Sequence, residues 1–396
     1  MSDGLLLVDA THTSHTSAQT GIQRVCRALF RELDLVGRAA PVCYDPHLIG
    51  WRPLVSDELA VLRDYSGGAG KSRGARWTWS QKIAGASRRW FRGKPALPPA
   101  TGLICPELFS AKIGSCLPGL MSSVTGPRVA IFYDAIPLKF PELTPSGTVA
   151  RFPVYLQELL RFDGIAAISE DSAASLRDYW RWLGADQFPP VQAIPLGIDH
   201  TVAPAEDRQT PAPAVPRLLC VGTIEGRKNH LALLEACETL WREGAAFELE
   251  LIGLPRPDTA AAALAKIAAL RAAGHPLIFS GSVSEASLHQ AYARASFTIY
   301  PSLIEGFGLP VLESLRYGKP CVCSGRGALG EAARGGGCLA LDAVDATSLA
   351  SALRGLLQDS GALGALSAAA ARRKFKSWSD YAGEFSAWMQ TVPRRG

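Results

Sequence analysis

Two glutamates frame a glycine-bearing loop in the stretch YPSLIEGFGLPVLE, where an apolar strand gives way to a helix. Glycine lets the backbone approach a ligand closely, and the unpaired N–H groups at a helix N-terminus attract anions. A phosphate site is therefore predicted at Gly306, Phe307, Gly308 and Leu309. Glu313, about one turn into the helix, can accept hydrogen bonds from paired hydroxyls. The alternative is an ordinary connection, with Glu305 and Glu313 as solvated surface charges.

Two cations precede another predicted helix, in the segment GTIEGRKNH. Arg227 and Lys228 at a helix N-terminus would clamp a diphosphate, and such cations stabilise the charge that develops on a departing diphosphate. A solvated basic loop is the alternative. The glycine loop expected at the same sheet edge favours the functional interpretation.

Further candidates lie in the first half of the chain. In TGIQRV, Gly21 allows close approach, and Arg24 faces either a ligand or solvent. In IFYDAIPLKFPE, Asp134 ends a predicted strand and can hold sugar hydroxyls or orient an acceptor. His12 and His15 lack a third ligand nearby, so we expect hydrogen-bonded surface histidines rather than a metal site. The chain also has no Asp-x-Asp pattern, so metal-dependent diphosphate binding lacks its usual carboxylates.

Apolar runs alternate between strand and helix patterns almost throughout, which predicts parallel sheets covered by helices on both faces. A segment rich in proline and alanine, residues 200–216, is typical of a linker. It separates a domain at 1–199 from a second domain at 217–375, which is followed by a final helical segment at 376–396. In the second domain ligands are expected beyond the carboxyl ends of the strands.

The chain has 396 residues, enough for two domains, and its 47% apolar and 19% charged residues are typical of a globular enzyme. No run approaches the ~18 apolar residues of a spanning helix, and no cleavable leader is visible, so a cytoplasmic location is expected. The nine cysteines are expected to be reduced and mostly buried. Cys321 and Cys323 share one face of a short strand, but no second pair at zinc spacing follows, so we expect neither a metal nor a disulfide there.

Residues 71–94 combine eight basic residues with four aromatic residues and no acidic residue. This composition suits an anionic membrane surface, because indoles settle at the headgroup level and each cation adds attraction. A solvated loop is an equally weighted alternative. Nucleic acid could use the same composition, but no nucleic-acid motif is present, and we predict no such partner.

The two glutamates that bracket GFGLPVL resemble the signature of retaining glycosyltransferases of family four, a glutamate, seven residues and a second glutamate. The resemblance is dense over residues 218–341 and thinner over residues 5–199. It implies that Glu305 meets the donor sugar, that the glycine loop holds the diphosphate, and that Glu313 holds the ribose. IFYDAIPLKFPE is similar to a stretch of bacterial mannosyl and rhamnosyl transferases, where a histidine often stands in place of Tyr133.

The resemblance also places three weaker candidates. The segment that ends at Val283 resembles the backbone that meets the nucleotide base. Gly21 resembles the glycine of a loop that lies against the donor diphosphate and the acceptor. The family commonly has a cation at the position of Thr223, and this departure leaves the partner of Lys228 open.

The fold implied is α/β of the GT-B type, with two Rossmann-like doubly wound domains facing across a cleft. The implied function is retaining, metal-independent transfer of a hexose, such as mannose or rhamnose, from a nucleotide-diphosphate sugar to a glycan acceptor. The catalytic set would be Glu305, Lys228, Arg227 and Asp134.

A GDP-sugar is favoured over a UDP-sugar as the donor, and no further cofactor is expected. A lipid-linked acceptor in polysaccharide or O-antigen biosynthesis, met at the inner face of the cell membrane, would explain the basic aromatic segment. Two alternatives stay open. One is a sugar-nucleotide epimerase on the same fold, and the other is a non-catalytic scaffold of a polysaccharide-assembly complex.

Overall fold

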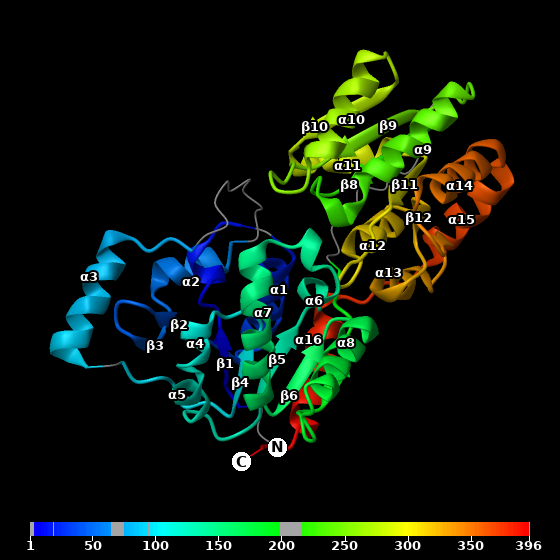
Figure 1. The fold of residues 1–396 in the computed structure, drawn as a ribbon. Coiled ribbons are helices and arrows are strands. Elements are labelled where there is room, and N and C mark those ends of the chain that lie inside the picture. Colours follow the sequence, from blue (N-terminus) through cyan, green and yellow to red (C-terminus); the bar gives the residue numbers. More distant parts are fainter. Residues whose placement is uncertain (1–3, 19, 65–74, 94, 199–214, 396) are drawn as a thin grey trace. The chain divides into compact units, whose positions relative to one another are not determined.

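The computed structural model describes residues 4–18, 20–64, 75–93, 95–198 and 215–395. The chain divides into two compact units (Figure 1). Unit 1 comprises Met1–Leu138, Ser146–Gly197 and Lys376–Gly396, and unit 2 comprises Lys139–Pro145 and Ile198–Phe375. Most of the linker predicted at 200–216 lies outside the described residues.

Unit 1 is built on a seven-stranded sheet in which β2 and β3 pair antiparallel and all other neighbours pair parallel. In spatial order the strands are β3 (Gly50–Pro53), β2 (Ala39–Asp45), β1 (Leu6–Asp9), β4 (Gly102–Cys105), β5 (Arg128–Phe132), β6 (Gly164–Ala167) and β7 (Val191–Ala193). Strands β1, β4 and β6 are buried along their whole length, as expected of a sheet covered on both faces.

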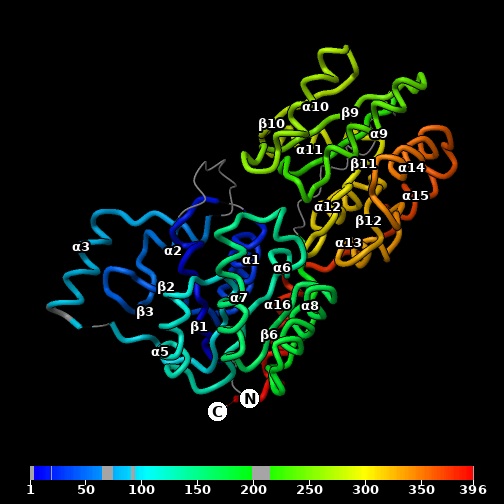
Figure 2. The backbone as a smooth tube through the Cα atoms, viewed as in Figure 1, coloured from blue at the N-terminus to red at the C-terminus, as the bar shows by residue number. Residues whose placement is uncertain are grey.

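The α-helices of unit 1 pack around this sheet. They are α1 (Gly21–Leu35), α2 (Ser56–Leu62), α3 (Trp79–Ser87), α4 (Ala111–Gly114), α5 (Leu117–Met121), α6 (Ile136–Lys139), α7 (Ser146–Glu158), α8 (Glu170–Trp182) and α16 (Trp378–Thr391). The last of these, α16, packs against α1 (Figure 2). Its Tyr381 and Phe385 are fully buried, which ties the C-terminal segment to the first unit.

Unit 2 has a six-stranded, wholly parallel sheet. In spatial order the strands are β10 (Leu277–Gly281), β9 (Glu248–Ile252), β8 (Arg217–Val221), β11 (Phe297–Tyr300), β12 (Cys321–Ser324) and β13 (Cys338–Leu341). The α-helices are α9 (His230–Arg242), α10 (Ala261–Ala272), α11 (Glu285–Arg294), α12 (Leu309–Arg316), α13 (Gly327–Ala333), α14 (Ala346–Gln358) and α15 (Ser360–Arg372).

Both units are doubly wound sheets, and the strand order reverses once in each. In unit 1 the reversal lies between β1 and β4, and in unit 2 it lies between β8 and β11. Connections that leave the carboxyl ends of two such neighbours diverge to opposite faces and open a crevice that ligands use. The two reversals are therefore the first places to look for a site.

Among the described residues, no helix combines the length and the apolar character that crossing a membrane would require.

Two buried carboxylates occupy the reversal in unit 1. Glu107 follows β4 and accepts the backbone N–H groups of His12 and Thr13, each at 2.7 Å. Asp9 ends β1, is only 1% exposed, and accepts the N–H of Thr11 at 3.0 Å. Burial, and then the charge of Glu107, raise the pKa of Asp9 to about 7. These carboxylates hold the loop between β1 and α1.

Asp9→Asn should flatten the pH dependence of the free energy of unfolding. The folded chain keeps a proton on Asp9 that the unfolded chain has released, so wild-type stability falls as pH rises from about 4 to about 7, by on the order of 2–4 kcal/mol. Asparagine keeps the accepting oxygen and does not titrate. Urea denaturation across this pH range measures the effect.

The matched control for that experiment is Asp178→Asn, since this carboxylate lies on the surface with its side chain 70% exposed. The control should retain the wild-type slope. An Asp9→Asn variant with the same slope would contradict the assignment of the raised pKa.

Candidate active site

The structure brings Arg227 and Lys228 onto the carboxylate of Glu305. Arg227 Nη1 lies 2.8 Å from Glu305 Oε2, and Lys228 Nζ contacts Oε1. These side chains come together because β8 and β11 are adjacent parallel strands, so the loops that follow them leave the same edge of the sheet. Three of the four predicted catalytic residues thus form one cluster, and Lys228 has Glu305 as its partner.

The charge of Glu305 is fixed by its two cations. Burial alone would raise the pKa of this carboxyl group, but the ammonium of Lys228 and the guanidinium of Arg227 outweigh burial and lower the pKa to about 2. The side chains of Glu305 and Lys228 are each 12% exposed, so water screens the pair only in part. Glu305 therefore accepts hydrogen bonds at physiological pH and has no proton to donate.

Arg227 is held by a second carboxylate that the sequence analysis did not single out. Glu225 is 7% exposed, and its Oε1 lies 2.7 Å from Arg227 Nη2. Its other oxygen, Oε2, lies 3.2 Å from Nη1 of Arg256 in the loop after β9. Glu225 was visible in the motif GTIEGRKNH, whereas Arg256 carried no signal, because only the pairing of β8 with β9 brings it near.

Helix α9 begins at this cluster. Asn229 takes a left-handed conformation with φ of 57°, and its Nδ2 donates to the carbonyl of Val344 at 2.7 Å. His230, the first residue of α9, is 2% exposed, and neither ring nitrogen has a hydrogen-bond partner among the described residues. Burial, and then the charge of Lys228, lower its pKa to about 4. The neutral imidazole adds no further positive charge beside Lys228.

The predicted glycine loop joins β11 to α12. Gly308 has φ of 95° and is the residue before the helix, a conformation that favours glycine. A Cβ at Gly308 would also lie 3.1 Å from the Cβ of Ala332, which leaves little room for a side chain. Gly306 is half-buried, and Phe307 packs its ring against a core cluster that includes Val311. Leu309 begins α12, so its N–H is among the unpaired groups of the helix start.

Glu313 lies on α12 beside buried tyrosines. Burial raises the pKa of Tyr317 to about 12, and the negative charge of Glu313 is the next cause. Tyr292 stacks on Tyr317 with ring centroids 4.5 Å apart. Two further candidates of unit 2 are Val283 and Thr223. Val283 packs against an apolar cluster that contains Tyr292, and Thr223 is half-buried just after β8.

The candidates of unit 1 lie at the carboxyl ends of its own strands. Asp134 follows β5, and its Oδ1 accepts the N–H of Ile136 at 3.0 Å at the start of α6. Tyr133 points into the core, where its hydroxyl donates to the carbonyl of Pro106 at 2.6 Å. Gly21 is the exposed first residue of α1, and nothing lies within 4 Å of the position a Cβ would take. Packing therefore does not require glycine there.

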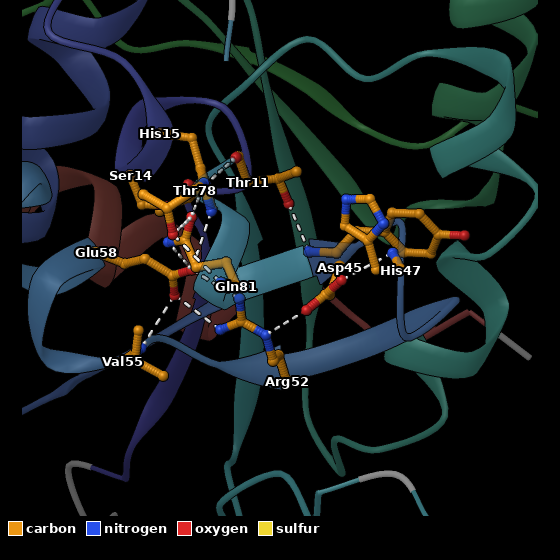
Figure 3. A network of polar contacts seen from close by, with 12 residues as sticks. Thr11, Ser14, His15, Asp45, His47, Arg52, Val55, Glu58, Thr78 and Gln81 are labelled. Carbon is orange, nitrogen blue, oxygen red and sulfur yellow. Dashed lines mark hydrogen bonds and ion pairs between the residues drawn. The ribbon is translucent and has the colours of Figure 1, made fainter. Parts of the chain in front are cut away.

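His15 corrects the expectation of a surface histidine. It is 5% exposed, and its Nε2 lies 3.0 Å from Glu58 Oε1. Arg52 binds Glu58 through both terminal nitrogens, each at 2.7 Å, and binds Asp45 through Nε at 2.8 Å (Figure 3). Burial would raise the pKa of Glu58, but the hydrogen bonds from Arg52 and His15 lower it to about 2. Arg52 and Glu58 come from β3 and α2, which gave no motif.

A protein-family model for glycosyl transferases of group 1 matches residues 215–359. This stretch holds the cluster of Arg227, Lys228 and Glu305 together with Glu313. Residues 215–359, the group 1 domain, are therefore similar to the glycosyl transferases of this family.

Known proteins are similar to longer stretches of the chain. The serotype-specific mannosyltransferase WbdA of Escherichia coli is 28% identical over 338 residues, which are 80% of this chain and 38% of that protein. The O-antigen chain mannosyltransferase B of Escherichia coli is 34% identical over 164 residues, which are 41% of this chain and 42% of that protein. The chain spans less than half the length of these relatives.

Solved structures give the fold of the whole chain. Sucrose-phosphate synthase from Thermosynechococcus elongatus matches with a TM-score of 0.68 and 18% identity over 98% of each chain. The Anabaena protein HepE, in complex with UDP and glucose, matches with a TM-score of 0.67 and 13% identity over 98% of this chain and 100% of that chain. The group 1 glycosyl transferase domain is thus one half of a GT-B fold, and this part of the sequence prediction is confirmed.

Glu305→Gln should destabilise the group 1 domain. Arg227 and Lys228 would lose the carboxylate that both contact, at a cost of about 2 kcal/mol in the free energy of unfolding. Glu305 contributes this stability above its unfolded pKa near 4.5 and loses it as pH falls toward 2, so the difference between the two proteins should shrink in acid. Urea denaturation at pH 7 and pH 3 measures it.

The control is Glu243→Gln, which breaks a surface ion pair with Arg354 whose side chains are 48% and 39% exposed. That change should cost less than about 0.5 kcal/mol. Equal costs for the two substitutions at pH 7 would refute a special role for the Glu305 cluster.

Proposed function

We propose that this chain is a retaining hexosyltransferase that moves mannose or a similar hexose from a nucleotide-diphosphate sugar to a glycan acceptor. The observation that carries the proposal is the pair of cations, Arg227 and Lys228, held on Glu305 next to the glycine start of α12. The group 1 domain and the relatives named as mannosyltransferases support it. They do not favour an epimerase or a scaffold.

Glu305 prepares the two cations before a donor arrives. A diphosphate brings negative charge to Arg227 and Lys228, which are already positioned and need little rearrangement. Glu305 stays ionised, because its pKa of about 2 lies far below physiological pH. Its oxygens can then accept hydrogen bonds from the hydroxyls of the donor sugar, while the start of α12 supplies N–H groups to the phosphate and Glu313 accepts from the ribose.

In this proposal the acceptor hydroxyl attacks from the face that the diphosphate leaves. The acceptor oxygen bonds to the anomeric carbon as the bond from that carbon to the phosphate oxygen breaks, and the departing phosphate oxygen takes the acceptor proton. Arg227 and Lys228 stabilise the charge on the diphosphate, so positioning and electrostatics lower the barrier without a metal ion. Asp134 of unit 1 is the residue that would orient the acceptor.

The donor base is part of the proposal. We favour GDP over UDP because the relatives act on mannose by name. HepE, which binds UDP and glucose, is only 13% identical, so it bears on the fold and not on the donor of this chain.

Lys228→Ala and Glu305→Ala should each lower turnover by at least about a hundredfold, because each removes charge next to the departing diphosphate or the donor sugar. Calorimetry with GDP and UDP, followed by product analysis with GDP-mannose and a glycan acceptor, measures binding and turnover separately. Glu243→Ala on the surface of the same domain is the matched control and should leave both unchanged.

Near wild-type turnover in both variants would overturn the site. Consumption of the sugar nucleotide without any acceptor would indicate an epimerase. A chain that binds neither GDP nor UDP at millimolar concentration would behave as a scaffold.

We also infer that unit 1 docks on the inner face of the cell membrane through α3 and the π-helix Arg88–Arg92 that follows it. Trp79, Ile83 and Trp90 are 79%, 61% and 73% exposed. Trp79 and Ile83 lie four residues apart and therefore on one side of α3, and Trp90 lies in the π-helix. Lys82 and Arg89 are exposed among them. Exposed indoles beside cations suit a bilayer that contains anionic lipids. Part of the predicted segment, residues 71–74 and 94, lies outside the described residues.

The polar network of unit 1 holds this element in place. Trp77 stacks on His15 with ring centroids 3.8 Å apart, and Gln81 of α3 donates to Glu58 at 2.9 Å (Figure 3). A Cβ at Gly85 would lie 2.9 Å from Asp45 Oδ1 and 2.9 Å from the Cβ of His47, so α3 packs closely on the end of β2 and the loop after it. The inner side of α3 is therefore fixed, and its apolar residues point outward. Such a surface would bring the chain to a lipid-linked acceptor.

Replacing Trp79, Ile83 and Trp90 together by serine should reduce binding to anionic vesicles by at least about tenfold, because the apolar side chains no longer enter the interface. Co-sedimentation with phosphatidylglycerol vesicles measures binding, and phosphatidylcholine vesicles test the need for anionic lipid. Trp182→Ser removes an equally exposed indole, also 79% exposed, from α8 and should bind like the wild type. Equal binding by the triple variant would refute the membrane surface.

A further inference from the structure

Three thiols converge in the interior of unit 2. Cys321 and Cys323 lie two residues apart on β12 and therefore on one face of the sheet. Cys338, the first residue of β13, pairs with Cys321 in the parallel register. The three Sγ atoms all lie within 4.8 Å of one another. Sequence spacing gave Cys321 and Cys323 no partner, because Cys338 reaches them only through the pairing of β12 with β13.

The surroundings of this thiol cluster, Cys321, Cys323 and Cys338, are apolar except at one point. Cys321 and Cys323 are fully buried, and Cys338 is half-buried. All three pack in the core cluster that contains Val311 and Leu315 of α12. The guanidinium of Arg373 lies close enough for its charge to act on Cys338 and Cys323. It donates to the carbonyls of Gly336 and Ala332 at 3.0 and 2.6 Å, which fixes its position.

The spacing of the sulfur atoms fits a metal ion. A thiolate sulfur lies about 2.3 Å from zinc, so three sulfurs around one ion are about 4 Å apart. The cluster would therefore close by less than about 1 Å on binding. Sulfur donors without oxygen or nitrogen ligands select soft ions. We propose that Cys321, Cys323 and Cys338 form a binding site for a soft d10 metal ion, Zn²⁺ or Cu(I).

Two simpler interpretations explain less of the arrangement. Cysteine often behaves as a small apolar residue, which accounts for the burial of each thiol but not for the meeting of three sulfur atoms. A disulfide would join two of the sulfurs and leave the third without a role. A metal ion uses all three, and it places positive charge among buried thiolates that would otherwise be costly.

Binding of a metal ion would release the thiol protons and leave a net charge that a neighbouring cation can offset. Each thiol that becomes a ligand releases its proton to solvent as its bond to the metal forms. Three thiolates around Zn²⁺ carry one net negative charge, which the guanidinium of Arg373 offsets. The half-buried side at Cys338 follows a run of three glycines, where Gly336 and Gly337 have φ of 89° and 80°. This turn is the approach to the site for an ion or for a fourth ligand from solvent.

The site is separate from the proposed donor site but shares its core. Val311 and Leu315, which pack with the thiols, lie on the helix that carries Glu313. A bound ion would therefore raise the thermal stability of unit 2 while leaving the chemistry of Arg227 and Lys228 in place. This inference does not depend on the proposed function.

The test uses the full chain, reduced and stripped of metal with a chelator. Zn²⁺ is added in one arm, and Cu(I) held by a weak competing chelator is added in the other, both without oxygen. We expect about one ion per chain by native mass spectrometry, a thiolate-to-metal absorption band and a raised melting temperature. Cys323→Ser and Cys338→Ser should each weaken binding at least roughly a hundredfold and abolish the rise in melting temperature.

Cys237→Ser removes another buried thiol of unit 2, on α9, and should bind like the wild type. The metal-free melting temperatures of all variants show whether each chain is folded. Unchanged binding in both cluster variants, or no binding by the wild type at micromolar Zn²⁺ and Cu(I), would overturn the site. The arm with the tighter binding identifies the ion.

Discussion

The adjacency of β8 and β11 in a parallel sheet determines the candidate active site. Arg227 and Lys228 lie far in sequence from Glu305, and the reversal of strand order brings the two loops to one edge. The ion pairs then fix side chains that would otherwise be mobile, because lysine and arginine lose much rotamer freedom on ordering. A carboxylate between two cations supplies that order before any ligand binds, and α12 begins only four residues beyond it.

The cluster of Arg227, Lys228 and Glu305 differs from the buried ion-pair network of unit 1 in its exposure to solvent. Glu305 and Glu225 each contact two cations, so the proposed diphosphate would meet cations that carboxylates already hold in position. The network of Arg52, Glu58 and Asp45 in unit 1 is also paired, but it is almost fully buried and its hydrogen bonds end within the protein. The first arrangement is suited to binding, and the second is suited to holding α3 in place.

The sequence predicted most of the fold because its local signals agreed. The alternation of strand and helix patterns predicted parallel sheets covered by helices, and both sheets have this form apart from the antiparallel strand β3. The sequence also identified Arg227, Lys228 and Glu305, since each lies in a motif. It missed Glu225, Arg256 and Cys338, whose partners come from strand pairing, and it placed His15 on the surface because a lone histidine in a polar segment gives no sign of burial.

The two reversals of strand order differ in a way that bears on where an anionic donor binds. In unit 1 the reversal holds Asp9 and Glu107. Burial raises the pKa of both carboxyl groups, and their oxygens accept hydrogen bonds from residues 11–13. Two buried carboxyl groups offer no positive charge to a phosphate and already use their oxygens to fix a loop. In unit 2 the same position holds two cations and a helix N-terminus. The cations and the helix N-terminus therefore favour unit 2 over unit 1 for the proposed diphosphate.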